Sequence, residues 1–116
     1  MRDHRKLRAF ELADRLVLSV YRETTNFPRH EQFGLTNQMR RAAVSIASNI
    51  VEGCARRTQA DYLCFLDMAY GSARELEYQL SLAYGLEFLP ADRYEQIRDE
   101  AVETSKVLGG LIRSLR

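Results

Sequence analysis

The apolar residues of this chain recur at spacings of three and four, which is the pattern of α-helices with one buried face. The pattern predicts four helices, over about 7–24, 36–56, 59–85 and 90–115, preceded by a basic N-terminal tail at 1–6. No alternating β-branched run bounded by turn residues predicts a strand. Because the connections are short, consecutive helices should be antiparallel neighbours. The fold predicted for the single domain 1–116 is therefore all-α, an up-down-up-down four-helix bundle.

Local signals mark the expected helix ends. Thr36 is a plausible N-cap for the second helix, and Thr58 followed by Asp61 has the spacing of a capping box. Gly85 can end the third helix in the left-handed conformation. The glycine pair at 109–110 weakens the fourth helix by about 1 kcal/mol per residue against alanine, so its last turns are expected to fray or bend.

The second helix has a polar stripe beside its apolar one. Ser45 and Asn49 lie on this stripe, although each costs a helix about half a kcal/mol against alanine. We expect the stripe to meet polar residues of the third helix, where Gly71 would allow close approach. The predicted interface network comprises Gln38, Arg41, Ser45, Asn49, Glu52, Ser72, Glu75 and Glu77. A solvated face and a ligand or catalytic pocket remain the alternatives.

Apolar residues also occur outside the predicted core faces, most of all on the third helix. A helix that is apolar nearly all round is usually buried nearly all round, whereas a small bundle buries one side of each helix. Self-association is therefore expected, and both a ring and a two-fold pair fit the pattern. The predicted oligomer surface comprises Val44, Val51, Leu63, Met68, Tyr70, Leu82 and Leu86.

Composition narrows the classes of function. The net charge of +1 gives no global field that commits the chain to nucleic acid or membrane. Two cysteines without a CxxC pattern indicate reduced thiols of a cytoplasmic protein, and His4 and His30 have no partners at metal spacing. No apolar run approaches the ~20 residues that span a bilayer. Neither a metal, nor a cofactor, nor a membrane partner is expected.

Residue-level support for an enzyme is lacking. Ser45 and Ser72 have no histidine in the same predicted helices, so a serine nucleophile lacks its base. Glu75 and Glu77 are two residues apart and would point about 200° from each other on a helix. They cannot flank one bond as hydrolytic carboxylates must. The chain is predicted not to be an enzyme.

Clusters of basic residues are the candidate nucleic-acid surface. These residues are Arg2, Arg5, Lys6, Arg8, Arg40, Arg41, Arg56 and Arg57. In a ring they would repeat by symmetry and form a band of positive potential. The predicted fourth helix carries an acidic face that counts against nucleic-acid binding. The alternative to a nucleic-acid surface is that charges of both signs are simply exposed to solvent.

The runs FGLTNQMRRAAVSIASNIVEGCARR and FLDMAYGSARELEYQL resemble the bacterial four helix bundle protein family, also called the 23S rRNA intervening sequence protein family. Val51 stands where the family often has alanine. The matching positions are Phe33, Leu35, Thr36, Gln38, Arg40, Arg41, Ala42, Ala43, Ser45, Ile46, Asn49, Ile50, Glu52, Gly53, Arg57, Phe65, Leu66, Gly71, Ser72, Glu75, Leu76 and Glu77.

The resemblance implies an antiparallel four-helix bundle that assembles as a pentameric ring. It also implies a possible nucleic-acid partner, because similar accessory proteins of diversity-generating retroelements bind a reverse transcriptase and nucleic acid through a basic surface. The function predicted is a non-enzymatic, homo-oligomeric accessory or scaffold protein that engages RNA, DNA or a nucleic-acid enzyme. A protein-protein adaptor is the alternative, and an enzyme of unknown type is third.

Overall fold

The protein is described by a computed structural model over residues 2–116, and four long helices make up most of it. They are α1 (Arg8–Thr24), α2 (Leu35–Cys54), α3 (Gln59–Gly85) and α4 (Ala91–Leu115). Two short 3-10 turns, η1 (His4–Lys6) and η2 (Arg29–Glu31), precede α1 and α2. Residues 2–116 contain no strand. The predicted all-α four-helix fold is confirmed.

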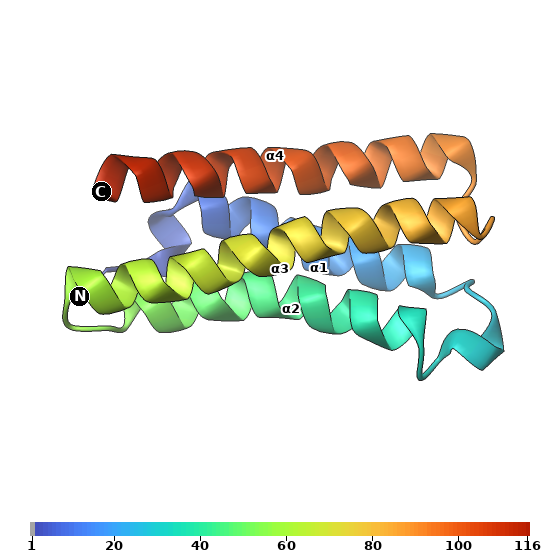
Figure 1. Cartoon of the computed structure of the whole chain (residues 1–116), viewed down its shortest axis with the longest axis horizontal. Coiled ribbons are helices and arrows are strands. Elements are labelled where there is room, and N and C mark those ends of the chain that lie inside the picture. The colour runs from blue at the N-terminus through green and yellow to red at the C-terminus, as the bar shows by residue number, and fades with distance from the viewer. Residues whose placement is uncertain (1) are drawn as a thin grey trace.

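The four helices form an elongated bundle with consecutive helices antiparallel (Figure 1). Each long helix contacts two others, in the pairs α1–α2, α2–α3, α3–α4 and α1–α4. The longest dimension is 43 Å. One end, which we call the basic end, holds η1, the α2–α3 connection and the C-terminus of α4. The opposite end, which we call the cleft end, holds the α3–α4 turn and the α1–α2 connection with η2.

Apolar side chains from all four helices fill the centre of the bundle. Residues that are fully buried include Leu16 of α1, Met39 and Ile46 of α2, Leu66, Leu76 and Leu80 of α3, and Ile97 and Leu108 of α4. Burial of each such side chain contributes about 1.5–3 kcal/mol through the removal of apolar surface from water. The core is therefore continuous along the bundle and fixes the positions of the residues on its surface.

The start of α3 is as predicted, whereas the start of α2 is not. The Thr58 hydroxyl accepts the Asp61 N–H at 3.1 Å and caps α3. In α2 the N-cap is Gly34, and the Leu35 N–H donates to the Glu31 carboxylate at 2.9 Å. Thr36 is buried inside the helix. The predicted threonine cap is wrong because η2 supplies a capping carboxylate from the preceding turn.

The end of α3 also differs from the prediction. Gly85 is still helical, and the left-handed residue is Glu87, whose φ is 65°. The Glu87 N–H donates to the Tyr84 carbonyl and the Phe88 N–H to the Ala83 carbonyl, both at 2.9 Å. This pair of bonds is the Schellman arrangement that closes a helix. It turns Phe88 back toward Phe27, whose ring centroid lies 5.5 Å away, so tertiary packing places the turn two residues later.

The glycine pair in α4 does not end the helix, which continues to Leu115. Gly109 is buried, and a Cβ there would lie 3.3 Å from the ring of Tyr70. The glycine therefore makes room for an aromatic side chain of α3. Within residues 2–116, no helix has both the length and the apolar character needed to cross a bilayer.

Candidate functional site

The centre of the predicted polar network lies between α2 and α3. The Ser45 and Ser72 hydroxyl oxygens are 2.9 Å apart. The Asn49 amide donates to the Ser45 carbonyl at 2.9 Å and to its hydroxyl at 3.0 Å. All three side chains are half-buried. These hydrogen bonds join the two helices at mid-length and satisfy polar groups that the packing partly removes from water.

A shallow hollow continues from this contact toward the cleft end. Gln79, which is 4% exposed, donates to Glu75 at 3.2 Å, but its Oε1 is the one buried side-chain polar atom in residues 2–116 without a partner. Glu75 therefore anchors the buried amide at the edge of the hollow. The lining residues are Phe33, Asn37, Gln38, Arg41, Ala42, Ser45, Ser72 and Glu75.

Two of the predicted network residues lie elsewhere. Glu77 pairs with Arg74 at 3.4 Å and accepts a hydrogen bond from Ser105, so its carboxylate faces α4. Glu52 is exposed beyond the hollow, near the end of α2. The predicted close approach at Gly71 is also wrong, because nothing lies within 4 Å of a Cβ built there.

The close approach of α2 and α3 occurs instead at Gly53, near the basic end. A Cβ on Gly53 would lie 3.0 Å from the Phe65 Cβ and 3.2 Å from the Tyr62 ring. Such contacts are tighter than most that real Cβ atoms make, so a side chain at this position would require Phe65 and Tyr62 to shift by a few tenths of an ångström.

The predicted oligomer surface divides into exposed and half-buried residues. Leu63 and Tyr70 are half-buried and pack against the core, and Gly109 on α4 creates the space for Tyr70. Val51 is half-buried. The other members are exposed, namely Val44, Met68, Leu82 and Leu86. Phe33, at the rim of the hollow, is 88% exposed and is the most exposed large apolar residue of the described chain.

The N-terminal residues predicted to form a tail are folded onto the bundle from residue 2 onward. The Arg2 guanidinium lies 4.0 Å from the centroid of the Tyr62 ring and donates to the Arg56 carbonyl at 3.3 Å. The Asp3 carboxylate accepts from the Arg5 N–H and caps η1, and Arg5 holds the pKa of Asp3 below its ordinary value. Met1 lies outside the described residues.

The connection from α2 to α3 supplies two more arginines at the same end. The Arg56 guanidinium lies 4.8 Å from the centroid of the Phe65 ring, and its Nε donates to the Glu52 carbonyl at 3.2 Å. Arg2, Ala55, Arg56 and Arg57 line a single cleft. In residues 2–116, no carboxylate lies within ion-pairing distance of the Arg2, Arg56 or Arg57 side chains.

The remaining predicted basic residues do not share this cleft. Arg5 pairs with Asp3 at 3.0 Å, and Arg8 lies 4.0 Å from Glu103. Arg40 donates to the Thr24 hydroxyl at 2.9 Å, which ties α2 to α1. Arg41 lines the hollow between α2 and α3. Lys6 is exposed on η1. The structure therefore gathers only part of the predicted set at one end.

A buried thiol lies below the arginine cleft. Cys54 is the last residue of α2 and is 1% exposed. Burial raises the pKa of its thiol, and the nearby Arg2 charge acts in the opposite direction. Burial likewise raises the pKa of the Tyr62 hydroxyl, and the nearby Cys54 acts in the same direction. Both shifts favour the neutral forms of the two groups.

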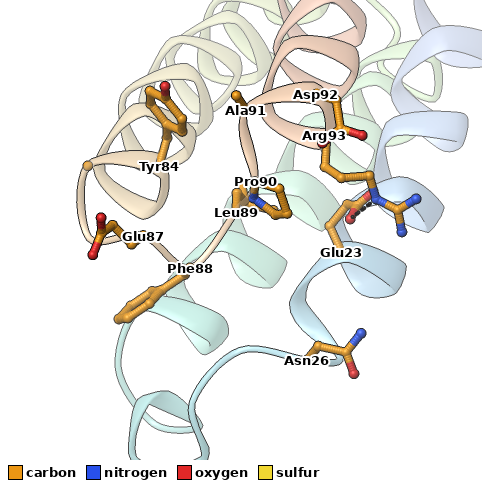
Figure 2. Close-up of a pocket in the computed structure, with 11 residues that line it drawn as sticks. Glu23, Asn26, Tyr84, Glu87, Phe88, Leu89, Pro90, Ala91, Asp92 and Arg93 are labelled. Atoms are coloured by element: carbon orange, nitrogen blue, oxygen red, sulfur yellow. Dashed lines mark hydrogen bonds and ion pairs between the residues drawn. The ribbon is translucent and has the colours of Figure 1, made fainter.

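The cleft end has a different character, shown in Figure 2. Its cleft lies around the α3–α4 turn and is lined on one side by Tyr84, Glu87, Phe88, Leu89 and Pro90. On the opposite side it is lined by Glu23 of α1 and by Asn26, which follows α1. Arg93 and Glu23 point toward each other and pair at 3.1 Å. The only guanidinium that lines this cleft in the described chain is thereby neutralised.

No three His, Cys, Asp or Glu side chains within residues 2–116 are arranged to hold a metal ion. Three residues of the hollow, Phe33, Asn37 and Ala42, were not among the predicted site residues, and neither was Gln79, which bonds Glu75 at its edge. Phe33 directly precedes Gly34, at which α2 begins. Its place outside the apolar stripe of the helix was the one signal in the sequence that its side chain is exposed. Gln79 occupies a core position of α3, and a polar residue at such a position was the signal for a buried polar contact.

Comparison with known families gives a match between residues 5–110 and the model for the 23S rRNA-intervening sequence protein. The chain is also similar to a solved structure from Bacteroides thetaiotaomicron VPI-5482, a protein of unknown function from the S23 ribosomal protein family. The TM-score is 0.83 with 24% identity, over 90% of this chain and 95% of that chain. The comparison with curated proteins gives no match.

Proposed function

This chain belongs to the 23S rRNA-intervening sequence protein family, and we propose that it is a non-enzymatic accessory protein that binds RNA through phosphate contacts at its basic end. The observation that carries the proposal is the contact between Arg2 and the corner that connects α2 to α3. The hydrogen bond from Arg2 to the Arg56 carbonyl joins segments 54 residues apart. It brings basic groups of both segments to one cleft.

The aromatic rings at this end favour phosphate binding by holding the guanidinium groups in place. Arg2 lies over Tyr62 and Arg56 over Phe65, so each side chain loses little further freedom when an anion binds. The N–H groups not used in protein contacts remain available for phosphate oxygens, which guanidinium binds in bidentate geometry.

The test is a titration of fluorescent structured RNA and single-stranded DNA at several salt concentrations. The double variant K6A/R57A removes two unpaired charges at the basic end, and R22A/R29A removes two exposed charges near the cleft end. Each lost phosphate contact should reduce the magnitude of the log–log salt slope by about one unit. We expect the slope for K6A/R57A to fall in magnitude by about two units, and the slope for R22A/R29A to equal that of the parent chain. Binding that does not depend on salt would refute the proposal.

Self-association is the second part of the proposal, and the exposed Phe33 supports it. An aromatic ring that is 88% in water beside Arg41 and a polar hollow has the composition of an interface centre with a polar rim. A homo-oligomer would cover this ring, and a ring of five subunits is the stoichiometry that the family resemblance favours. A protein-protein adaptor would use the same surface for a different partner.

Light scattering over a concentration series tests this part. Phe33→Ser should lower the mass of the assembly, whereas Tyr78→Ser, at another exposed aromatic residue outside the hollow, should preserve it. A parent chain that stays monomeric at high concentration would refute self-association. Capture of a different protein by the parent, lost in Phe33→Ser, would favour the adaptor.

A further inference from the structure

The N-terminal residues 2–6 form a strap across the corner between α2 and α3. Arg2 contacts Tyr62 and the Arg56 carbonyl at one end of this strap. At its other end the His4 ring meets the Phe10 ring edge-on, with centroids 4.7 Å apart. Few contacts hold the strap, and individual cation–π contacts and hydrogen bonds are each weak. Segments with so few contacts open locally without unfolding of the whole protein.

The strap lies near the thiol of Cys54. Arg2 donates to the carbonyl of Arg56, which follows Cys54 by two residues, and the Cys54 thiol is 1% exposed. Tyr62, which lies under the Arg2 guanidinium, is itself buried at the end of α2 and packs close to Gly53, the residue before Cys54. Opening of the strap would remove Arg2 from Tyr62 and give solvent access to the end of α2. The reactivity of Cys54 therefore reports on whether the strap is closed.

The arginine cleft crosses the boundary between the strap and the corner. Arg2 lines it from the strap, while Arg56 and Arg57 line it from the corner. No acidic residue lines this cleft. An anion that accepts hydrogen bonds from both sides is bound only when the strap is closed. A ligand with such a preference shifts the equilibrium toward the closed state.

We propose that this cleft is a phosphate site and that a phosphate bound between Arg2 and Arg57 clamps the strap closed over Cys54. Phosphate matches the site because its oxygens can accept from guanidinium groups on both sides at once. The inference rests on the proposed RNA binding only for the source of the phosphate, which is either a nucleic-acid strand or the free ion.

The experiment measures the alkylation rate of Cys54 by iodoacetamide, followed by mass spectrometry. It uses the full chain with Cys64→Ser, because the exposed Cys64 would otherwise react. Inorganic phosphate, added at constant ionic strength against chloride, should slow alkylation of Cys54 in a saturable manner. Arg2→Ala should raise the rate about tenfold, which corresponds to loss of the contacts that Arg2 makes. Phosphate should then have no further effect.

Three variants separate the clamp from general charge effects. Arg57→Ala should abolish the response to phosphate, because Arg57 lines the cleft without holding the strap. Lys6→Ala removes a neighbouring charge outside the cleft and should preserve both the rate and the response. Arg2→Lys keeps the charge but loses the planar group, so its rate should lie between those of the parent and Arg2→Ala.

Oligonucleotides with and without a 5′-phosphate distinguish the sources of the ligand. Protection by both identifies phosphates within a strand, protection by the phosphorylated form alone identifies a terminal phosphate, and protection by inorganic phosphate alone identifies the free ion. An Arg2→Ala rate equal to that of the parent would overturn the strap. A parent rate unaffected by any of these anions would overturn the clamp, even if salt-dependent RNA binding were observed.

Discussion

The two ends of this bundle are closed by different kinds of interaction. At the basic end, Arg2 and Arg56 lie over aromatic rings, and a side chain from the N-terminal segment reaches the carbonyl of a residue 54 positions away. At the cleft end, backbone hydrogen bonds close α3, Phe88 packs near Phe27, and the nearest guanidinium is paired with Glu23. The cleft at the basic end therefore keeps its guanidinium charge available, whereas the guanidinium that lines the cleft at the other end is neutralised.

This difference shows two ways in which the end of a helical bundle can be closed. The turn at the cleft end needs no solvent-facing charge, since its polar backbone groups bond to each other. The basic end leaves guanidinium groups without carboxylate partners and relies on ring contacts to fix them. Three predictions test whether the two ends differ in this way, beginning with the largest expected effect.

The substitution Gly53→Ala should destabilise the basic end. Its new Cβ would lie 3.0 Å from the Phe65 Cβ, and the cost of such overpacking is about 1–3 kcal/mol. Gly85→Ala at the cleft end is the matched control, because nothing lies within 4 Å of its Cβ and alanine is the better helix former by about 1 kcal/mol. Urea denaturation should therefore show opposite signs. Equal effects would mean that the helices do not approach closely at Gly53.

The substitution Glu87→Gly should stabilise the protein by about 1 kcal/mol. Glu87 has a φ of 65°, a conformation that glycine adopts without the steric cost that a side chain brings. Glu87→Ala removes the same charge but keeps the strain, so its unfolding midpoint should stay near that of the parent. A gain in both variants would assign the effect to the carboxylate and not to the backbone.

The smallest predicted effect is a loss of stability at alkaline pH that originates at the basic end. Burial raises the pKa of Cys54 above its ordinary value of 9.0 and that of Tyr62 above 10.0. The unfolded chain then releases these protons at lower pH than the folded chain, so stability present below pH 9 declines as pH rises further. Urea midpoints between pH 7 and 10.5 should fall less steeply in Cys54→Ser and Tyr62→Phe, whereas Tyr84→Phe at the cleft end should follow the parent.

The features that could be predicted from the sequence are those set by neighbours along the chain. The four helices follow from apolar spacing, and the Thr58 cap follows from the Asp61 N–H three residues later. The left-handed residue was predicted at Gly85 but is Glu87, because the packing of Phe88 decides where the chain turns. Tyr70 was expected on an outer face, yet it occupies space left by Gly109 on another helix.

The candidate sites show the same division. Helical spacing placed Ser45 and Asn49 on one stripe and suggested that Ser72 faced them, and the three do lie together. The contact between Arg2 and the α2–α3 corner depends on how a segment outside the long helices folds back onto Tyr62. The hydrophobic periodicity could not predict this contact, because η1 is only three residues long and too short to show a helical pattern.

The order of the helices in space also bears on how fast the chain reaches its native state. Among the four long helices, α1 and α4 are the only contacting pair that are not consecutive in the sequence. Almost all helix pairing is thus local, a topology associated with folding in about microseconds to milliseconds. Closure of α1 against α4 is the one step that must join distant parts of the chain. We therefore expect substitutions at that seam to slow folding more than equally destabilising substitutions between α2 and α3.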